Sequence, residues 1–355
     1  ENWDADQVWS HTNVGVPFEI SNYSDPNDVL SSYFGRANYN YMSRYYFSAT
    51  FRADGSSKFA KGNRWGFFPT FSVAWRLSDE SFMKWSEKWL NDFKIRFSYG
   101  VAGNNNIPSG LIQQLYNSNS TSWINGVTSY WAPSKTMANP DLKWETTYTR
   151  NLGFDYSFLN GRINGTMEFY WNNTKDLLIQ YPVAGTGYDY QYRNMGETSN
   201  RGFELTVNGV IVDKKDWGIT VGANISFNKN KVVSLGNLES IDNIATGWAS
   251  SEIDQDFIIK TGEPIGQIYG YQSAGRYTVD DFDIEESKAK GAWVLNAGVP
   301  DASTVIGPSV RPGSMKIDDT NGDGKITTDD RNIIGDTNPT CIGGFNISAR
   351  YKGLD

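Results

Sequence analysis

The sequence predicts an all-β fold, a transmembrane antiparallel β-barrel to which this chain contributes about nine strands. Three observations support this prediction. Apolar and polar side chains alternate in nine segments, aromatic side chains concentrate at the ends of those segments, and short and long connections alternate along the chain. The composition agrees, because 39% of the 355 residues are hydrophobic and 15% are aromatic. Disordered chains, in contrast, are poor in aromatic residues.

The composition also excludes several classes of protein. No run of apolar residues approaches the ~18 that a membrane-spanning helix needs. A single cysteine, Cys341, excludes an internal disulfide framework, and a single histidine, His11, leaves little room for histidine catalysis. The net charge of −8 comes without basic runs, which gives no support for nucleic-acid binding. We expect no enzyme, because none of the acidic residues stands out as a catalytic pair.

The predicted strands are identified by alternation with a period of two residues. In residues 44–54, for example, Tyr45, Phe47 and Phe51 alternate with polar side chains. The nine segments, in chain order, are residues 33–41, 44–54, 67–77, 93–101, 147–158, 162–171, 203–211, 217–228 and 345–352. Alternation places the apolar set on one face of each strand. Most segments have the roughly 10–12 residues that suit a tilted strand crossing a bilayer.

The two faces of these strands differ in polarity, as expected if one face contacts lipid and the other contacts water. The polar face carries charged and amide side chains such as Arg96, Glu168 and Asn224, which a water-filled lumen tolerates. On the apolar face, Trp217 and Phe227 flank an aliphatic middle, as in the two aromatic girdles of an outer-membrane barrel. The alternative is a soluble β-fold with aromatic side chains scattered through its core.

The connections assign the two sides of the membrane. Short connections lie at residues 41–44, 159–161 and 213–216. Long connections lie at residues 52–66, 103–145, 172–200 and 229–343. Outer-membrane barrels have short periplasmic turns and long outer loops. One intermediate connection, residues 78–92, falls on the short side, and we expect it to form a compact helix with Phe82, Trp85 and Trp89 on one side.

The strand count predicts the extent of the domain. Bacterial single-chain barrels have even numbers of strands, so nine strands indicate an incomplete portion of a larger barrel. We therefore expect residues 1–355 to form part of one barrel domain that lacks its first and last strands. Residues 229–342 would form a long extracellular loop region.

That loop region contains the strongest local motif, residues 319–330. Its acidic and amide residues follow the spacing of a helix-loop-helix calcium site, with Gly324 at the position of the sharp turn. The expected ligands are Asp319, Asn321, Asp323, Lys325 through its carbonyl, and Asp330. We expect one structural Ca²⁺ with roughly seven oxygen ligands at about 2.3–2.6 Å. The alternative is a metal-free turn; a calcium sensor is not expected, because no amphipathic helix precedes the loop.

Exposed aromatic side chains in the predicted loops are candidates for ligand binding. Flat aromatic faces can stack on sugar rings or peptide side chains, and loops commonly carry binding residues. The candidates are Trp123, Trp131 and Trp248. The alternative is that these side chains pack the loops against one another.

Several stretches, in order along nearly the whole chain, resemble the SusC (SusC/RagA) family of TonB-dependent outer-membrane transporters of Bacteroidetes. The matching stretches are residues 45–59 (YYFSATFRADGSSKF), 65–76 (WGFFPTFSVAWR), 91–100 (NDFKIRFSYG), 139–145 (NPDLKWE), 200–204 (NRGFE), 319–330 and 351–355 (YKGLD). The resemblance implies a 22-stranded barrel with an N-terminal plug, a segment that contacts TonB and a SusD-like surface lipoprotein as a lid.

The resemblance also implies a function, energised import of glycans, oligosaccharides or peptides across the outer membrane. We expect the plug and the TonB-contact segment of the family pattern to lie outside these residues, so the partners would be the remaining barrel and plug segments, the lipoprotein lid, the ligand and outer-membrane lipid. Two other functions stay open on the sequence alone. One is a soluble, calcium-stabilised carbohydrate-binding β-module, and the other is a passive porin with the same fold.

Overall fold

The computed structural model divides the chain into two compact units. The first contains residues 1–229 and 341–355, and the second contains residues 230–340. The structure describes residues 28–124, 127–183, 185–244, 246–248, 255–307 and 309–352. His11 lies outside the described residues.

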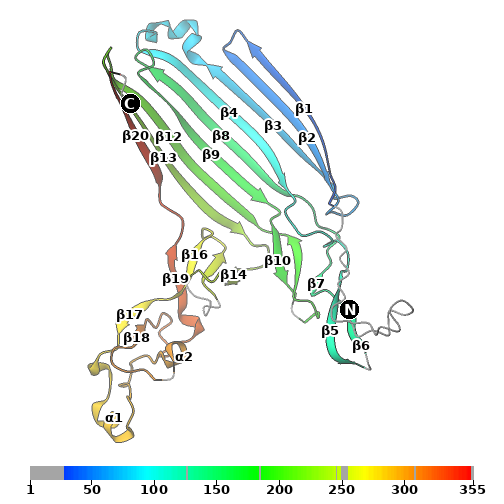
Figure 1. Ribbon diagram of the computed structural model, residues 1–355, viewed down its shortest axis with the longest axis vertical. Helices are drawn as coiled ribbons and strands as arrows, with labels where there is room; N and C mark the ends of the chain where they lie inside the picture. The colour runs from blue at the N-terminus through cyan, green and yellow to red at the C-terminus, as the bar shows by residue number, and fades with distance from the viewer. Residues whose placement is uncertain are drawn as a thin grey trace, which may run out of the picture. The chain divides into compact units, whose positions relative to one another are not determined.

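A nine-stranded sheet forms most of the first unit (Figure 1). Its strands are β1 (Leu30–Tyr41), β2 (Tyr45–Ser56), β3 (Trp65–Arg76), β4 (Leu90–Asn104), β8 (Glu145–Phe158), β9 (Ile163–Lys175), β12 (Glu197–Asp213), β13 (Trp217–Ser234) and β20 (Ile342–Tyr351). They lie in chain order, and pairing is antiparallel from β1 to β12 and between β13 and β20. All nine predicted strands are therefore confirmed.

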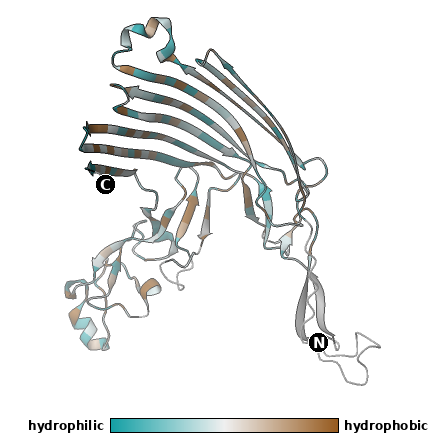
Figure 2. Cartoon of the chain, turned by 45° about the horizontal axis from the view of Figure 1, so that its top comes forward, coloured by the Kyte–Doolittle hydropathy of each residue, from teal (hydrophilic) through white to brown (hydrophobic). Residues whose placement is uncertain are grey.

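The register lines up the apolar side chains of neighbouring strands. Tyr45 lies opposite Trp75, Trp75 opposite Ile95, Ile95 opposite Phe154, and Phe154 opposite Met167. Because side chains alternate between faces, this row and the rows two residues away form one continuous apolar face. Figure 2 shows the resulting bands of hydrophobic and hydrophilic residues along the strands.

Several strands are longer than their predicted segments, and most of the extra residues lie at the long-loop ends, although β4 also begins at Leu90 instead of residue 93 at the short-turn end. β12 starts at Glu197 instead of residue 203, and β13 continues to Ser234 instead of residue 228. The extensions contain polar runs such as residues 228–231. A strand that projects beyond the lipid can be polar on both faces, so alternation is lost there although strand pairing continues.

The long connections contain shorter strands that the sequence pattern did not predict. In the first unit they are β5 (Tyr116–Ile124), β6 (Val127–Pro133), β7 (Thr136–Met137), β10 (Leu178–Pro182) and β11 (Tyr190–Asn194). In the second unit they are β14 (Ser240–Ile244), β15 (Phe257–Lys260), β16 (Gln267–Tyr271), β17 (Ser273–Arg276), β18 (Met315–Ile317) and β19 (Arg331–Asp336).

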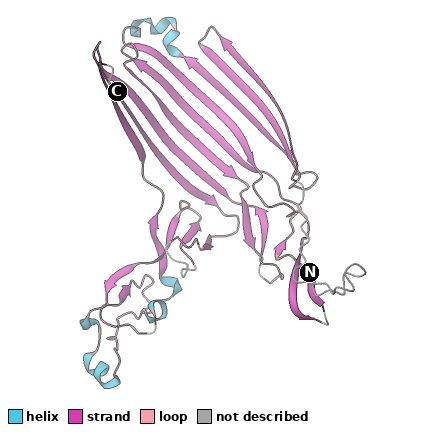
Figure 3. Cartoon of the chain, viewed as in Figure 1, coloured by secondary structure: helices cyan, strands magenta, loops and turns pink. Residues whose placement is uncertain are grey.

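The helices are short and lie in the connections (Figure 3). The expected helix after β3 is present as two 3₁₀ segments, η1 (Leu77–Asp79) and η2 (Ser81–Ser86), and it ends earlier than predicted. The others are η3 (Val279–Asp281), α1 (Ile284–Lys290), α2 (Ser303–Ile306) and η4 (Thr328–Asp330). In the described part of the chain, every helix is too short or too polar to cross a membrane.

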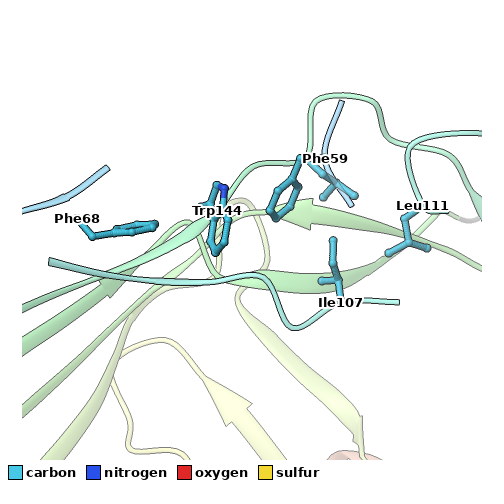
Figure 4. Close-up of a cluster of buried hydrophobic side chains, with 6 residues drawn as sticks. Phe59, Phe68, Ile107, Leu111 and Trp144 are labelled. Carbon is cyan, nitrogen blue, oxygen red and sulfur yellow. The ribbon is translucent and has the colours of Figure 1, made fainter. Parts of the chain in front are cut away.

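A compact hydrophobic cluster lies at the long-loop end of the sheet (Figure 4). Its buried members are Phe59, Phe68, Ile107, Leu111, Leu142 and Trp144. The ring of Phe68 lies edge-on to Trp144, with centroids 5.4 Å apart, and the indole of Trp144 donates a hydrogen bond to the carbonyl of Arg64 at 2.8 Å. A Cβ atom at Gly103 would lie 2.0 Å from the Phe68 ring, so glycine is required at this close contact.

The second unit has its own core. Its buried residues are Tyr277, Phe282, Ala302, Val310, Ile317 and Ile326. The hydroxyl of Tyr277 donates to the carbonyl of Pro300 at 2.5 Å and accepts from the amide of Ala302 at 3.2 Å. These bonds satisfy a fully buried phenol and join the segment of Tyr277 to residues 300–302.

Replacing Phe68 by alanine should destabilise the cluster by about 3–5 kcal/mol, because a buried ring is lost. Limited proteolysis of residues 105–115 in the purified, detergent-solubilised protein would measure the effect. Phe67 faces the opposite side of the same strand and is 60% exposed, so Phe67→Ala is the matched control. Its effect should be smaller than that of Phe68→Ala, because Phe67 lies outside the cluster and stacks on Phe51. Equal cleavage of the two variants would contradict the packing described here.

Candidate functional site

The polar face of the sheet carries a connected network of charged side chains. Register places Arg96 opposite Gly153, and Gly153 opposite Glu168. The guanidinium of Arg96 contacts Asp155 at 2.8 Å and Glu168 at 2.7 Å. The ammonium of Lys94 contacts Asp155 at 2.7 Å. Three neighbouring strands, β4, β8 and β9, are thus joined by side chains as well as by backbone pairing.

Gly153 makes room for this network. A Cβ atom at Gly153 would lie 3.0 Å from the guanidinium carbon of Arg96, so the arginine lies flat across the backbone of β8. The amide nitrogen of Asn151 donates to the second carboxylate oxygen of Glu168 at 3.0 Å. The network pairs two cations with two carboxylates, so the wall is polar here with little net charge.

An acidic side chain extends the network at its edge. Register places Glu204 on β12 directly opposite Glu168. Among the described residues, Glu204 has no ion pair, and it is exposed. The wall therefore presents one unpaired carboxylate to water beside the neutral network. Alternation in the sequence predicted this polar face but not the network, although Lys94, Arg96, Asp155 and Glu168 all fall on the polar sides of adjacent predicted strands.

The predicted calcium loop is a tightly hydrogen-bonded turn of the second unit. The two carboxylate oxygens of Asp319 accept from the amides of Gly322, at 2.7 Å, and Gly324, at 2.7 Å. Asn321 accepts from the amide of Asp323 at 2.9 Å. Gly322 and Gly324 both have positive φ, as such a sharp turn requires. Within the described residues, no three His, Cys, Asp or Glu side chains are gathered tightly enough to hold a metal ion.

Asp330 closes this turn from its far end. Its side chain is fully buried and accepts from the amides of Thr327, at 2.7 Å, and Thr320, at 3.0 Å. The Thr327 amide makes the largest contribution to holding the pKa of the Asp330 carboxyl below its usual range, against the opposing effect of burial. A lowered folded-state pKa stabilises the loop above the ordinary carboxyl pKa, and this contribution is lost as the pH falls through the lowered value.

The three candidate tryptophans do not form one described site. Trp123 lies in β5 and Trp131 in β6, and their side chains lie outside the described residues. Trp248 belongs to the second unit, is 60% exposed, and has its ring centroid 6.3 Å from that of Phe257. The structure therefore supports an accessible aromatic face at Trp248 alone.

An antiparallel sheet with a continuous apolar face, a charged inner face and long loops at one end defines the wall of an outer-membrane β-barrel. The chain belongs to the TonB-dependent receptor-like β-barrel family, whose model matches residues 2–309. Membership confirms the predicted fold class and places the chain in the outer membrane. It also decides against the soluble carbohydrate-binding module.

The similarity extends over nearly the whole chain. The chain is 33% identical over 347 residues to TonB-dependent receptor P3 of Formosa agariphila, with 96% of this chain and 32% of the relative covered. It is 32% identical over 334 residues to TonB-dependent receptor SusC of Bacteroides thetaiotaomicron, with 92% and 30% covered. The chain thus spans about a third of the length of these curated relatives. The predicted resemblance to SusC is confirmed.

A solved structure agrees with these relatives. The RagAB peptide transporter matches with a TM-score of 0.70 and 25% sequence identity, covering 92% of this chain and 32% of that chain. The RagAB peptide importer in its open-open state matches with a TM-score of 0.68.

Replacing Arg96 by methionine leaves Glu168 without its cation, and it should lower the free energy of unfolding by about 1–2 kcal/mol, since water still reaches the network. Urea unfolding in detergent, followed by tryptophan fluorescence, would measure the change. The double variant Arg96→Met/Glu168→Gln should recover part of the loss. Lys175→Gln is the control, because Lys175 is exposed and its ammonium lies 3.9 Å from Glu197, much farther than Arg96 lies from Glu168. An equal loss in both single variants would contradict the network's role.

Proposed function

We propose that this chain forms part of the wall and outer loops of a TonB-dependent nutrient importer of the outer membrane. The observation that supports the proposal is the similarity to SusC over 92% of the chain, on a sheet whose inner face carries the charged network of Arg96, Asp155 and Glu168. An inner wall with paired charges stays hydrated and presents few strong single charges to a neutral cargo. Such a surface suits the passage of an oligosaccharide or a peptide.

The importer would act with partners that lie outside this chain. A SusD-like surface lipoprotein would cover the outer loops, by analogy with SusC and with the RagAB complex. TonB would supply energy through a plug segment belonging to the rest of the barrel. Trp123, Trp131 and Trp248 would contact the cargo, and the exposure of Trp248 supports the role of that residue.

Removal of TonB should abolish import by the full-length transporter, because release of bound cargo into the periplasm needs external energy. The measurement is uptake of two fluorescent pools, one of oligosaccharides and one of peptides, by cells that contain or lack TonB. Cargo should still bind to the cell surface without TonB. Cells without the transporter provide the background.

A passive porin would give the opposite result in the same experiment. Uptake that continues unchanged without TonB would favour the porin and overturn the proposed import mechanism. The pool that is taken up in the presence of TonB would also identify the cargo as carbohydrate or peptide.

We propose further that residues 319–330 bind one structural Ca²⁺. The ligands would be the side chains of Asp319, Asn321, Asp323 and Asp330, with the carbonyl of Lys325. Oxygen donors of this kind suit a hard cation, and the glycine turn at residue 324 supports the fit. The acidic groups are not gathered in the present structure, so binding would draw them together around the ion. The bound ion would stabilise the fold of this outer loop.

Calcium added to the chelator-treated, full-length transporter should bind and protect residues 318–331 from proteolysis. Asp319→Asn removes a charged ligand and should weaken binding about tenfold, or about 1.4 kcal/mol. Titration calorimetry would measure both proteins. Asp329→Asn is the matched control, because Asp329 lies in the same loop outside the ligand positions. Absence of calcium binding, or equal weakening by both substitutions, would contradict the proposal.

A further inference from the structure

One connection at the short-turn end of the sheet is much longer than its neighbours. Residues 77–89 join β3 to β4, whereas the other described connections at this end are residues 42–44, 159–162 and 214–216. The long connection contains η1 and η2 and forms the helical feature between β3 and β4 in Figure 1. We name residues 77–89 the turn helix segment.

The turn helix segment presents large aromatic side chains to the outside. Phe82 and Trp85 are three residues apart in η2, and a 3₁₀ helix has three residues per turn, so both lie on one side. Trp85 is 69% exposed, the largest exposed fraction of any tryptophan whose side chain is described. Trp89 follows η2 and its ring lies 5.8 Å from that of Trp85.

These aromatic side chains continue the apolar outer face of the sheet. The ring of Phe82 lies 6.4 Å from that of Trp75, a member of the apolar row described above. The ring of Trp89 stacks on Phe158 at 6.0 Å with an interplanar angle of 8°. Phe158 lies four residues from Phe154, and therefore on the same face of β8. The segment thus extends the lipid-facing surface beyond the ends of β3 and β8.

The position of the turn helix segment is fixed at both ends. Near its start, the carboxylate of Glu80 accepts from the Tyr45 hydroxyl at 2.5 Å and from the Trp75 indole at 3.0 Å, and lies 3.5 Å from Arg44. At its other end, the carbonyl of Trp89 accepts from the amide of Leu159 at 2.8 Å. The exposed aromatic side chains are therefore held in place by neighbouring strands and turns.

Charged side chains border the aromatic group. Lys84 and Lys88 are exposed, and so is Glu87 between them; within the described part of the chain none of the three has an ion-pair partner. The acidic residues Asp79 and Glu80, in contrast, are paired with Arg76 and Arg44. Exposed tryptophan beside unpaired lysine is the combination that suits the boundary between acyl chains and phosphate groups.

We propose that the turn helix segment is an interfacial anchor that binds phospholipid in the periplasmic leaflet. Phe82, Trp85 and Trp89 enter the headgroup region, and Lys84 and Lys88 contact lipid phosphates. Continuity with the lipid-facing side of the sheet selects lipid over a protein partner. The anchor fixes the depth at which this part of the wall lies in the membrane, and it does not depend on the proposed transport function.

Site-directed spin labelling of the full-length transporter tests the proposal. The native cysteines, Cys341 among them, are replaced by serine, and a nitroxide is attached through Trp85→Cys. The protein is reconstituted in bilayers of phosphatidylethanolamine and phosphatidylglycerol. Accessibility to oxygen and to a water-soluble nickel complex is then compared with that of Lys215→Cys, which labels an exposed residue in another short turn.

The label at position 85 should show severalfold lower nickel accessibility and higher oxygen accessibility than the label at position 215. A water-like label at position 85 would overturn the proposal. A label that neither reagent reaches would also overturn it, because the aromatic group would then be covered by protein. Phe82→Cys provides a second label if the first variant fails to fold.

The lysines are tested by charge reversal. Lys84→Glu/Lys88→Glu should raise the nickel accessibility of the label at position 85, because glutamate is repelled by phosphate. Lys214→Glu/Lys215→Glu is the matched control and should leave that label unchanged. An unchanged label in the first variant would overturn the assignment of phosphate contacts to Lys84 and Lys88.

Discussion

Backbone hydrogen bonding in lipid is the constraint on which this structure depends. A polypeptide that crosses the hydrocarbon region must pair its amides and carbonyls internally, because water is absent there. Backbone pairing across nine neighbouring strands meets this demand between the strands and leaves the outer edges of β1 and β20 open. Pairing also fixes the register, and the register then decides which side chains meet lipid and which meet water. A shift of one residue in any strand would exchange the two faces.

Side-chain packing on the polar face follows from that register. Large polar side chains lie across glycine residues of neighbouring strands, as the ring of Tyr170 does at Gly202, where a Cβ atom would lie 2.2 Å from the ring. Arg96 makes the same use of Gly153. Glycine in a strand weakens it in isolation, yet here it allows a bulky group to lie flat against the sheet. Strand glycines such as Gly153 and Gly202 thus make room for the polar side chains of the wall.

The sequence predicted the sheet well because lipid imposes a pattern that can be read residue by residue. All nine strands were found from alternation, and the ends of β12 and β13 were missed where that alternation stops. The short strands of the loops escaped prediction because they pack in local clusters without a uniform face. The motif at residues 319–330 located a turn and its acidic residues. It did not predict that the Asp330 carboxylate would accept hydrogen bonds from the amides of Thr320 and Thr327, since such bonds depend on tertiary folding.

The aromatic side chains at the two ends of the sheet differ in burial. At the long-loop end, water meets both faces, and aromatic residues such as Phe68 and Trp144 turn inward to build a buried cluster. At the short-turn end, aromatic residues such as Trp85 turn outward and remain exposed, while the polar groups of Glu80, Tyr45 and Trp75 satisfy one another. An exposed tryptophan held by a hydrogen-bonded frame is poorly suited to water but well suited to a membrane interface. Aromatic residues therefore stabilise loops at one end and contact lipid at the other. The exposed fraction of the side chain distinguishes the two roles.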